Sequence, residues 1–240
     1  MPNWCDNSVR LTASKEKIDA LAKVLENADD RQVFQHLRPR PADQEDNWYD
    51  WNINNWGTKW DISLIDWNRE DDDTIWISFD TAWGPPIALY EYLFENEWYV
   101  DALYHEGGMA FCGQWIDGED DYHNYDISDK QSIENLPSDV VEFAGLDSAY
   151  EDYMENVQTD ILWQLPRTEY FDAKIKPVKH GRYIIKTKQS DYDHFATWDG
   201  SDWGKNWDGK KIKPTVWCGL TEELTEDKFQ ELVEEETSRC

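Results

Sequence analysis

The stretch "WCDNSVRLTASKEKIDALAKVLENA", residues 4–28, decides the fold class because it contains two hydrophobic periods in succession. From Trp4 to Leu11 apolar and polar residues alternate, which is typical of a strand with one buried face. After Ser14 the apolar residues recur at helical spacing, and Ser14 is a suitable N-cap although the glutamate of a capping box is missing. A strand followed by an amphipathic helix is therefore predicted.

A hairpin and a second helix are predicted next. Residues 61–67 and 74–83 have strand patterns on either side of the charged turn "NREDDD", residues 68–73. Residues 84–97 begin with a Gly-Pro-Pro sequence and continue with apolar residues on one helical face. The chain between the first helix and the hairpin, residues 29–57, shows no period and is expected to form an acidic, Trp-rich loop.

Another strand pair, residues 98–108 and 109–118, completes the first part of the chain. The order strand, helix, strand, strand, helix, strand, with one extra strand, is that of a split β-α-β sandwich. We therefore predict an α+β fold in which residues 1–118 form a ferredoxin-like domain with acidic Trp-rich loops.

Two further regions are predicted after residue 118. Residues 119–166 are expected to form an acidic loop, covering 119–131, and a helical bridge. Residues 167–240 are expected to form a small antiparallel β module with a terminal helix that Thr221 caps and that docks on the small sheet. Strand patterns occur in this module at residues 182–189, 194–200, 202–209 and 214–220.

The charge of the chain is strongly negative and unevenly distributed. The 240 residues include 51 acidic and 23 basic side chains, which gives a formal net charge of −28. Between Arg167 and Cys218 there are 11 basic and 7 acidic residues, which leaves 12 basic and 44 acidic residues elsewhere. Aromatic residues make up 15% of the chain, so a disordered acidic tail is excluded.

The electrostatic field of a net charge of −28 repels nucleic acid and anionic membranes, which argues against direct binding to either. One interpretation is a solvated surface that maintains solubility. The sharper interpretation is that rigid carboxylates imitate the phosphates of a duplex, so that the partner is a host nucleic-acid-binding protein with a basic groove. The basic stretch Lys174–Lys188, which includes Tyr183, suits single-strand stacking, but pairing with the acidic part of the chain is the favoured interpretation.

The four cysteines are scattered without a C-x-x-C pair, so neither a zinc site nor a disulfide framework is indicated. The start "MPNWCDNSVRL" shows no signal peptide, and no run reaches the roughly 18 apolar residues that a membrane helix needs. We expect reduced thiols and a location in the host cytoplasm.

Two sets of candidate site residues follow. The rings of Trp4, Trp56, Trp60 and Trp83 are expected to pack around one sheet edge, with Trp56 and Trp60 as anchors of their loop. The candidate ligand cleft consists of Trp56, Lys59, Trp60, Asp61, Asp80, Trp83 and Glu106. The candidate partner-binding carboxylates are Asp46, Asp50, Asp71, Asp72, Asp73, Glu119, Asp120 and Asp121.

No catalytic, metal or cofactor site is predicted. The acidic runs fail the calcium-loop template, and the five histidines lack zinc-site spacing. The weak enzymatic interpretation places His105 and Glu106 beside Cys112, with Asp61 or Asp80 as a base.

Four unusual words occur in a characteristic order in the first part of the chain: "MPNWCDN" (1–7), "NWGTKWD" (55–61), "FDTAWGPP" (79–86) and "YHEGGMAFCGQ" (104–114). On these words, residues 1–118 resemble the YubB-type ferredoxin-like family of plasmid and phage proteins. The resemblance implies a ferredoxin-like fold and an origin on a mobile element, and it implies no catalytic activity.

The leading functional hypothesis is an acidic, non-enzymatic interaction protein of a phage or plasmid. It is expected to inhibit a host nucleic-acid-directed defence enzyme by nucleic-acid mimicry. The alternative is an enzyme or small-molecule-binding protein with its site in the Trp-rich cleft, and a structural accessory protein is the third hypothesis.

Overall fold

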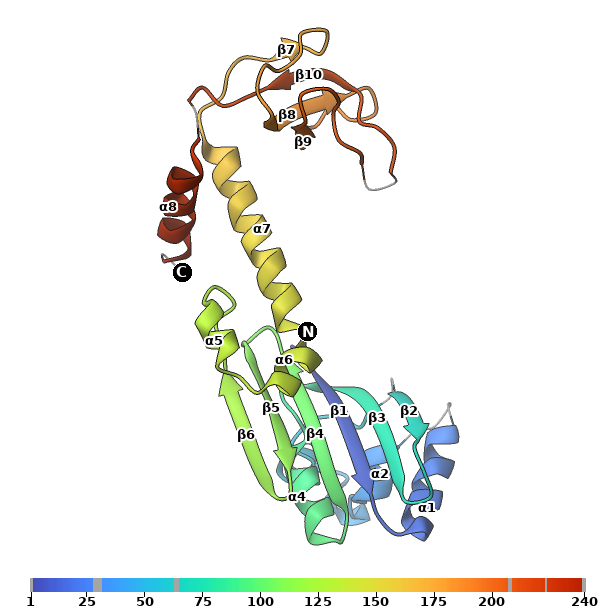
Figure 1. The fold of residues 1–240 in the computed structure, drawn as a ribbon. Coiled ribbons are helices and arrows are strands. Elements are labelled where there is room, and N and C mark those ends of the chain that lie inside the picture. The colour runs from blue at the N-terminus through green and yellow to red at the C-terminus, as the bar shows by residue number, and fades with distance from the viewer. Residues whose placement is uncertain (1, 28–31, 63–64, 207–208, 223, 239–240) are drawn as a thin grey trace. The chain divides into compact units, whose positions relative to one another are not determined.

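The computed structural model describes residues 2–27, 32–62, 65–206, 209–222 and 224–238 (Figure 1). The chain forms two compact units, Met1–Tyr153 and Met154–Cys240. The fold is α+β, as predicted, with one antiparallel sheet in each unit. The expected boundary at residue 118 lies inside the first unit, because Gly118 belongs to the turn between two paired strands.

The first unit contains a six-stranded antiparallel sheet in the order β2-β3-β1-β4-β5-β6. Its central strand β1 pairs along its whole length with β3, from Trp4 opposite Ala82 to Thr12 opposite Thr74. The strands are β1 (Trp4–Thr12), β2 (Ile65–Arg69), β3 (Thr74–Ala82), β4 (Tyr99–Glu106), β5 (Phe111–Ile116) and β6 (Glu119–Asn124).

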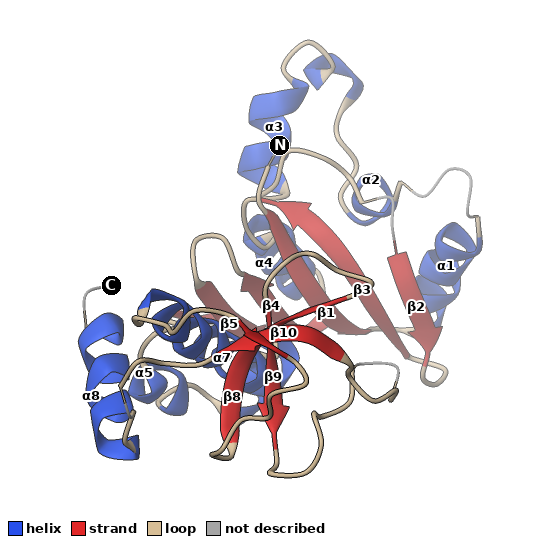
Figure 2. Cartoon of the chain, turned by 90° about the horizontal axis from the view of Figure 1, so that it is seen from above, coloured by secondary structure: helices blue, strands red, loops and turns tan. Residues whose placement is uncertain are grey.

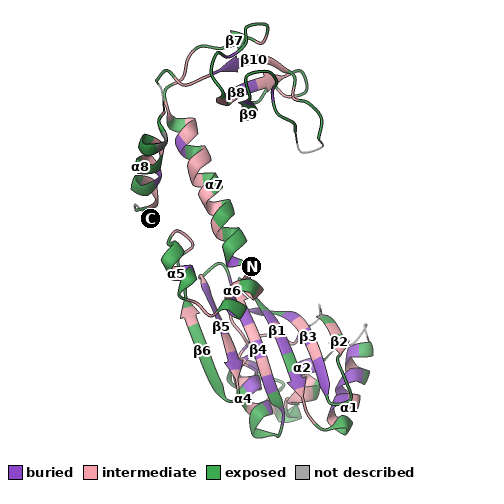
Figure 3. Cartoon of the chain, viewed as in Figure 1, coloured by how far each residue is buried: buried purple, intermediate pink, exposed green. Residues whose placement is uncertain are grey.

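Alternation along β1 gives the sheet its two faces. Cys5, Asn7, Val9 and Leu11 are buried on what we call the helix face, and the residues between them lie on the opposite, open face. Helices α1 (Lys15–Glu26) and α4 (Ile87–Glu95) cover the helix face and share one apolar core with the sheet (Figures 1 and 3). Buried aliphatic side chains of this size each contribute about 1.5–3 kcal/mol, so this core fixes the register of β1.

Residues 32–55 contain short helices, so the prediction of a structureless loop is wrong for this region. They are α2 (Val33–Leu37), a 3-10 turn (Ala42–Gln44) and α3 (Trp48–Asn55). Val33 and Phe34 of α2 are buried in the apolar core, where Phe34 meets Trp56 and Phe79 edge to face. Tertiary packing therefore stabilises helices that are too short to be stable alone.

Within the first unit, helices α5 (Lys130–Glu134) and α6 (Ser138–Ala144) cover part of β4 and β5 on the open face. Ile133 of α5 and Val140 of α6 pack there against Cys112 and the half-buried Leu103. Residues 119–124, expected to lie in a loop, form the edge strand β6 instead. Strand β6 hydrogen-bonds to β5 through its backbone, which requires no apolar side chains.

The second unit contains a four-stranded antiparallel sheet in the order β7-β10-β8-β9. Its core cluster consists of Ile185, Ala196, Trp198, Trp203 and Trp217. The strands are β7 (Phe171–Asp172), β8 (Gly181–Thr187), β9 (His194–Trp198) and β10 (Pro214–Cys218). The strand expected at 202–209 is represented among the described residues by isolated bridges, Trp198 with Trp203 and Lys205 with Lys211.

Helix α7 (Leu146–Gln164) leads from the first unit into the second, and α8 (Glu226–Thr237) follows the small sheet. The predicted cap at Thr221 is wrong, because the Thr225 hydroxyl accepts the hydrogen bond from the Lys228 amide. Figures 1 and 2 draw α8 away from the small sheet, on which it was expected to dock. No helix among the described residues is long and apolar enough to cross a membrane.

Candidate functional site: an aromatic cluster beside paired carboxylates

The loop "NWGTKWD", residues 55–61, is fixed at the end of β3 by its first residues. Trp56 is buried, and its indole N–H donates to the Arg38 carbonyl at 3.0 Å. Gly57 has φ +86°, and a Cβ there would lie 3.1–3.2 Å from backbone atoms of residues 86–88. Only glycine fits both the positive φ and the close approach to α4. The prediction that Trp56 anchors its loop is confirmed.

Thr58 and Asp61 hold the rest of the loop. The buried Thr58 hydroxyl donates to the Ala82 carbonyl at 3.3 Å and accepts from the Ala82 amide at 3.2 Å. The Asp61 carboxylate accepts from the Phe34 and Gln35 amides, both at 2.9 Å, at the start of α2. Burial raises the pKa of Asp61, and these backbone hydrogen bonds oppose the rise. Asp61 is therefore a structural helix cap.

Between these fixed points the loop displays Trp60 in an exposed aromatic cluster. Trp60 is stacked on Trp83 with ring centroids 6.1 Å apart, and Trp4 lies 6.2 Å from Trp60 on its other side. These three rings meet at the sheet edge, as predicted, but their exposed fractions are 51%, 39% and 49% for Trp4, Trp60 and Trp83. The prediction that Trp60 is a buried anchor like Trp56 is therefore wrong. We call Trp4, Trp60 and Trp83 the aromatic cluster.

Trp83 adopts a backbone conformation that is unfavourable for a bulky residue. Its φ is +67°, which costs about 1–2 kcal/mol for a residue with a Cβ. The Trp83 amide donates to the Asn3 carbonyl at 2.9 Å, and this bond holds the strained residue at the end of the β1–β3 ladder. Strain at an exposed large ring is typical of a functional position.

The Lys59 ammonium lies over the aromatic cluster. Its Nζ is 4.4 Å from the ring centroid of Trp60, 5.9 Å from that of Trp83 and 5.7 Å from that of Tyr49 in α3. Such contacts are favourable because the negative face of the ring attracts the cation. The aromatic surface therefore already accommodates an ammonium group of its own chain.

A cavity of about 600 Å³ opens beside the aromatic cluster, with Trp4, Trp60 and Asp80 among its lining residues. Asp80 of β3 is paired across the ladder with Asp6 of β1 on the open face. Burial, together with a hydrogen bond to the Asp6 carboxyl, raises the pKa of Asp80. The site can thus offer ring faces and closely spaced carboxyl groups to a cationic or planar group.

Glu106 does not belong to this cleft. It is buried, and its carboxylate accepts from the Gly108 amide at 2.9 Å and the Met109 amide at 2.7 Å, so it closes the turn between β4 and β5. Trp56 is likewise absent from the cavity lining because it is part of the core. Of the predicted cleft residues, the structure brings Lys59, Trp60, Asp61, Asp80 and Trp83 together.

The predicted partner-binding carboxylates lie at three places on the first unit. Asp71, Asp72 and Asp73 form the turn between β2 and β3, and Glu119, Asp120 and Asp121 lie on β6. These are opposite edges of the sheet, which five strand spacings of about 4.8 Å place roughly 24 Å apart. Asp46 precedes α3 and Asp50 lies in its first turn, near the Tyr49 ring that Lys59 contacts.

The charges of the two edges are compensated differently. In the hairpin turn, Asp72 lies 3.5 Å from Lys15 and 3.9 Å from Arg69. On β6, Asp120 accepts from the Tyr104 hydroxyl at 2.6 Å, and Asp121 lies 3.1 Å from His123. No lysine or arginine pairs with β6 among the described residues, so the β6 edge keeps more negative charge.

Sequence reasoning missed the carboxylates of the open face. Asp6, Asp66 and Asp101 lie on strands β1, β2 and β4, at positions paired with Asp80, Ser78 and Arg10 respectively. The period-two alternation predicted for these strands could have placed them on one face. They were overlooked because the charged runs of the loops were the stronger compositional signal.

The described residues contain no group of three or more side chains suited to a metal ion. His105 Nε2 lies 2.8 Å from the Tyr125 hydroxyl, and burial lowers the pKa of His105. Burial raises the pKa of the nearby Cys112 thiol to about 11, so this cysteine is not an activated nucleophile. Cys5 and Cys218 are also buried thiols, and Cys240 lies outside the described residues.

No protein family model matches the sequence, and no curated protein matches it. Among solved structures, the chain is similar to the crystal structure of a protein api92 from Yersinia pseudotuberculosis, which is assigned to the family model DUF1281. The sequence identity is 11% and the TM-score is 0.39, and the similarity covers 52% of this chain and 99% of that chain. At this distance the similarity supports no statement about the function of this chain.

Proposed function

We propose that the first unit is a ferredoxin-like domain of the YubB type. The strand order β2-β3-β1-β4, with α1 between β1 and β2 and α4 between β3 and β4, supports this proposal, because it is the order of a split β-α-β sandwich. The four sequence words that resemble the family lie around the β1–β3 end and the β4–β5 turn. Strands β5 and β6 then extend this sheet.

We further propose that the chain is a non-enzymatic interaction protein that binds a basic nucleic-acid groove of a host defence enzyme. The observation that carries this proposal is the set of carboxylates on neighbouring strands of one rigid sheet, with Asp6, Asp66, Asp80, Asp101 and Asp121 on the open face and its β6 edge. Backbone ladders fix these groups, so their spacing does not have to be ordered when the partner binds.

Electrostatic complementarity explains how such a surface would act. A negative surface raises the rate of encounter with a basic groove, and the effect weakens as salt screens the charges. The exposed aromatic cluster supplies what carboxylates alone lack, since Trp and Tyr are frequent hot-spot residues at protein interfaces. Asp6 and Asp80 adjoin this cluster, so the partner would meet an apolar anchoring surface and negatively charged groups side by side.

A charge-matched pair of variants tests the proposal. E119Q/D120N/D121N removes three charges from the β6 edge, and the amide oxygen introduced at position 120 can still accept from the Tyr104 hydroxyl. E231Q/E234Q/E235Q removes three charges from the exposed side of α8. Each protein is used to capture basic nucleic-acid-binding enzymes from a host lysate at low and high salt, and captured enzymes are then challenged with duplex DNA.

We expect DNA to release the captured enzyme, and we expect the β6 variant to associate about tenfold more slowly than the α8 variant, because steering depends on local charge. The captured enzyme should also lose activity on its nucleic-acid substrate when the chain is added. Equal association by the two variants, or capture that duplex DNA does not reverse, would refute mimicry by this surface.

A small-molecule site is the second candidate, favoured by the 600 Å³ cavity beside the aromatic cluster. That volume lies in the usual range for ligand pockets, about 300–1,000 Å³. A thermal-shift screen with planar and cationic compounds addresses it, with Trp60→Ala as the binding-deficient variant. A ligand that stabilises the wild type and the variant equally does not bind at this cavity.

A further inference from the structure

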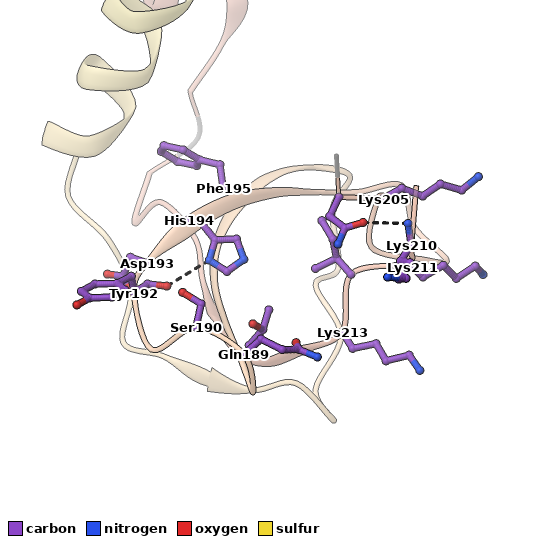
Figure 4. Close-up of a pocket in the computed structure, with 13 residues that line it drawn as sticks. Gln189, Ser190, Tyr192, Asp193, His194, Phe195, Lys205, Lys210, Lys211 and Lys213 are labelled. Atoms are coloured by element: carbon purple, nitrogen blue, oxygen red, sulfur yellow. Dashed lines mark hydrogen bonds between the residues drawn. The ribbon is translucent and has the colours of Figure 1, made fainter. Parts of the chain in front are cut away.

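The second unit contains a cleft of about 1070 Å³ between two connections of its small sheet. One wall is formed by residues 187–195, which join β8 to β9, and the other by residues 205–206 and 210–213, which precede β10. Figure 4 shows Gln189, Ser190 and His194 on the first wall and the lysines on the second. We call this feature the lysine cleft.

Backbone hydrogen bonds give the lysine-bearing wall a defined shape. The Ile212 amide donates to the Gly204 carbonyl at 2.9 Å, and the Gly204 amide donates to the Thr197 carbonyl of β9 at 2.9 Å. The Lys210 amide donates to the Asn206 side-chain oxygen at 2.9 Å, as drawn in Figure 4. The wall is thus tied to the sheet.

Four lysines line this wall, and all four are exposed: Lys205, Lys210, Lys211 and Lys213. In Figure 4 their side chains extend outward along the rim and do not converge on one point. That arrangement suits several phosphates of an extended chain better than a single bound anion. Two nearby carboxylates have partners: Asp202 lies 2.6 Å from Lys211 and compensates part of its charge, and Asp193 accepts from the Tyr170 hydroxyl at 2.5 Å.

The opposite wall adds ring faces and hydrogen-bonding groups. Tyr192 is 85% exposed, and His194 and Phe195 are half-buried beside it. The His194 Nδ1 atom lies 3.2 Å from the Tyr192 carbonyl, and this contact orients the imidazole ring. In Figure 4 the Tyr192 ring points away from the lysines, and the His194 imidazole faces them across the cleft. A ring opposite a row of lysines is a combination by which proteins bind unpaired strands, because bases stack on the ring and phosphates meet the cations.

We propose that the lysine cleft binds single-stranded nucleic acid, with Lys205, Lys211 and Lys213 facing phosphates and the His194 ring stacked on a base. A duplex does not fit this chemistry, because its base faces are covered by their neighbours. This proposal does not depend on the nucleic-acid mimicry proposed for the acidic first unit, so either proposal can be refuted without affecting the other.

The net charge of the whole chain does not exclude this site. Screening limits the influence of exposed charges to about 8 Å at physiological salt, so the groups near the cleft dominate. Around the cleft, the region from Arg167 to Cys218 has 11 basic and 7 acidic residues. The prediction that the chain does not contact nucleic acid rested on the total charge and therefore does not apply to this region.

Fluorescence anisotropy of the full chain with labelled dT12 and U12 tests the proposal between 50 and 200 mM salt. Three phosphate contacts predict a fall in log affinity against log salt with a slope of about −2.1, and K205Q/K213Q should reduce that slope by about 1.4. His194→Ala should weaken binding about tenfold through lost stacking. K205R/K213R should keep the binding, because it keeps the charge.

The matched control is K23Q/K174Q, which removes two exposed lysines outside the cleft. We expect it to bind like the wild type. No binding at 50 mM salt, or an equal loss in K205Q/K213Q and K23Q/K174Q, would overturn the proposal. Competition by a 12-base-pair duplex or by polyglutamate as effective as that by unlabelled dT12 would also overturn it, because the cleft would then be a general polyanion surface.

Discussion

Tryptophans have opposite roles in the two units. At the end of the first sheet, Trp60 and Trp83 are 39% and 49% exposed, whereas Trp198, Trp203 and Trp217 of the second unit are 3%, 5% and 7% exposed. In the first unit, helices α1 and α4 supply an aliphatic layer over the sheet. In the second, the core cluster comes from strands and their connections.

The difference shows that residue type alone does not assign a role. One tryptophan buries about 150–250 Å², so three rings can supply in the second unit much of the apolar area that α1 and α4 supply in the first. In the first unit the helices already fill the core, so additional tryptophan rings can remain exposed at the surface.

Trp217→Ala should have the largest effect on stability. Trp217 stacks on Phe171 at 4.7 Å, and its indole N–H donates to the Ile175 carbonyl at 2.7 Å. Removing a buried ring costs about 3–5 kcal/mol, which is a large share of the stability of a small unit. Urea unfolding followed by far-UV circular dichroism should show loss of one transition, with the other retained.

Trp60→Ala is the matched control on the display side of the comparison. We expect it to change the free energy of unfolding by less than about 1 kcal/mol, because the ring is partly exposed. A cost for Trp60→Ala as large as that for Trp217→Ala would mean that the aromatic cluster is core after all.

Gly57→Ala should have the next largest effect and lower the free energy of unfolding by about 2 kcal/mol. The substitution combines a positive φ with a Cβ only 3.1 Å from the Ile87 amide nitrogen. Gly84→Ala is the control, since a Cβ at Gly84 meets no atom within 4 Å and its φ is not in the left-handed region. Thermal unfolding compares the two, and equal melting temperatures would contradict the close fit of the loop against α4.

His105 should make the first unit sensitive to acid. Burial lowers the pKa of His105, and the negative charge of Glu106 opposes this shift without reversing it. The unfolded chain therefore binds a proton more readily than the folded one, so stability falls as the pH drops through 6.5, the ordinary value. His105→Asn should reduce this fall in urea unfolding at several pH values.

His36 contributes in the same direction, because burial also lowers its pKa, so part of the acid sensitivity should remain in His105→Asn. Exposed His180→Asn in the second unit serves as the control and should leave the acid sensitivity unchanged. An unaltered pH dependence in His105→Asn would show that the imidazole is not held neutral by its surroundings.

Lys59→Gln should have the smallest effect. A partly exposed ammonium over aromatic rings is worth about 0.5–1 kcal/mol, so stability should barely change. Tryptophan fluorescence should nevertheless change, because the ammonium lies 4.4 Å from the Trp60 ring. Lys23→Gln, in α1, should change neither quantity, and identical spectra for Lys59→Gln and the wild type would place the ammonium away from the cluster.

The regular elements of the first unit follow from local periods. Alternation along β1 and β3 and the helical spacing after Ser14 predict strands and a helix where the structure has them. Strand β6 was not predictable in this way, because an edge strand with the sequence "EDDYHN" exposes polar residues on both faces. Its pairing depends on the backbone of β5, which a local pattern does not represent.

By itself, the sequence determined the α+β class, the alternating faces of the central strands and the excess of carboxylates. The tertiary structure alone decided which tryptophans of "NWGTKWD" are hidden. Trp56 is buried because Arg38, 18 positions earlier, accepts its N–H, and Trp60 is displayed because Ala82 and the start of α2 fix the residues on either side. Contacts between distant segments set these roles, and such contacts leave no mark on the local period of the chain.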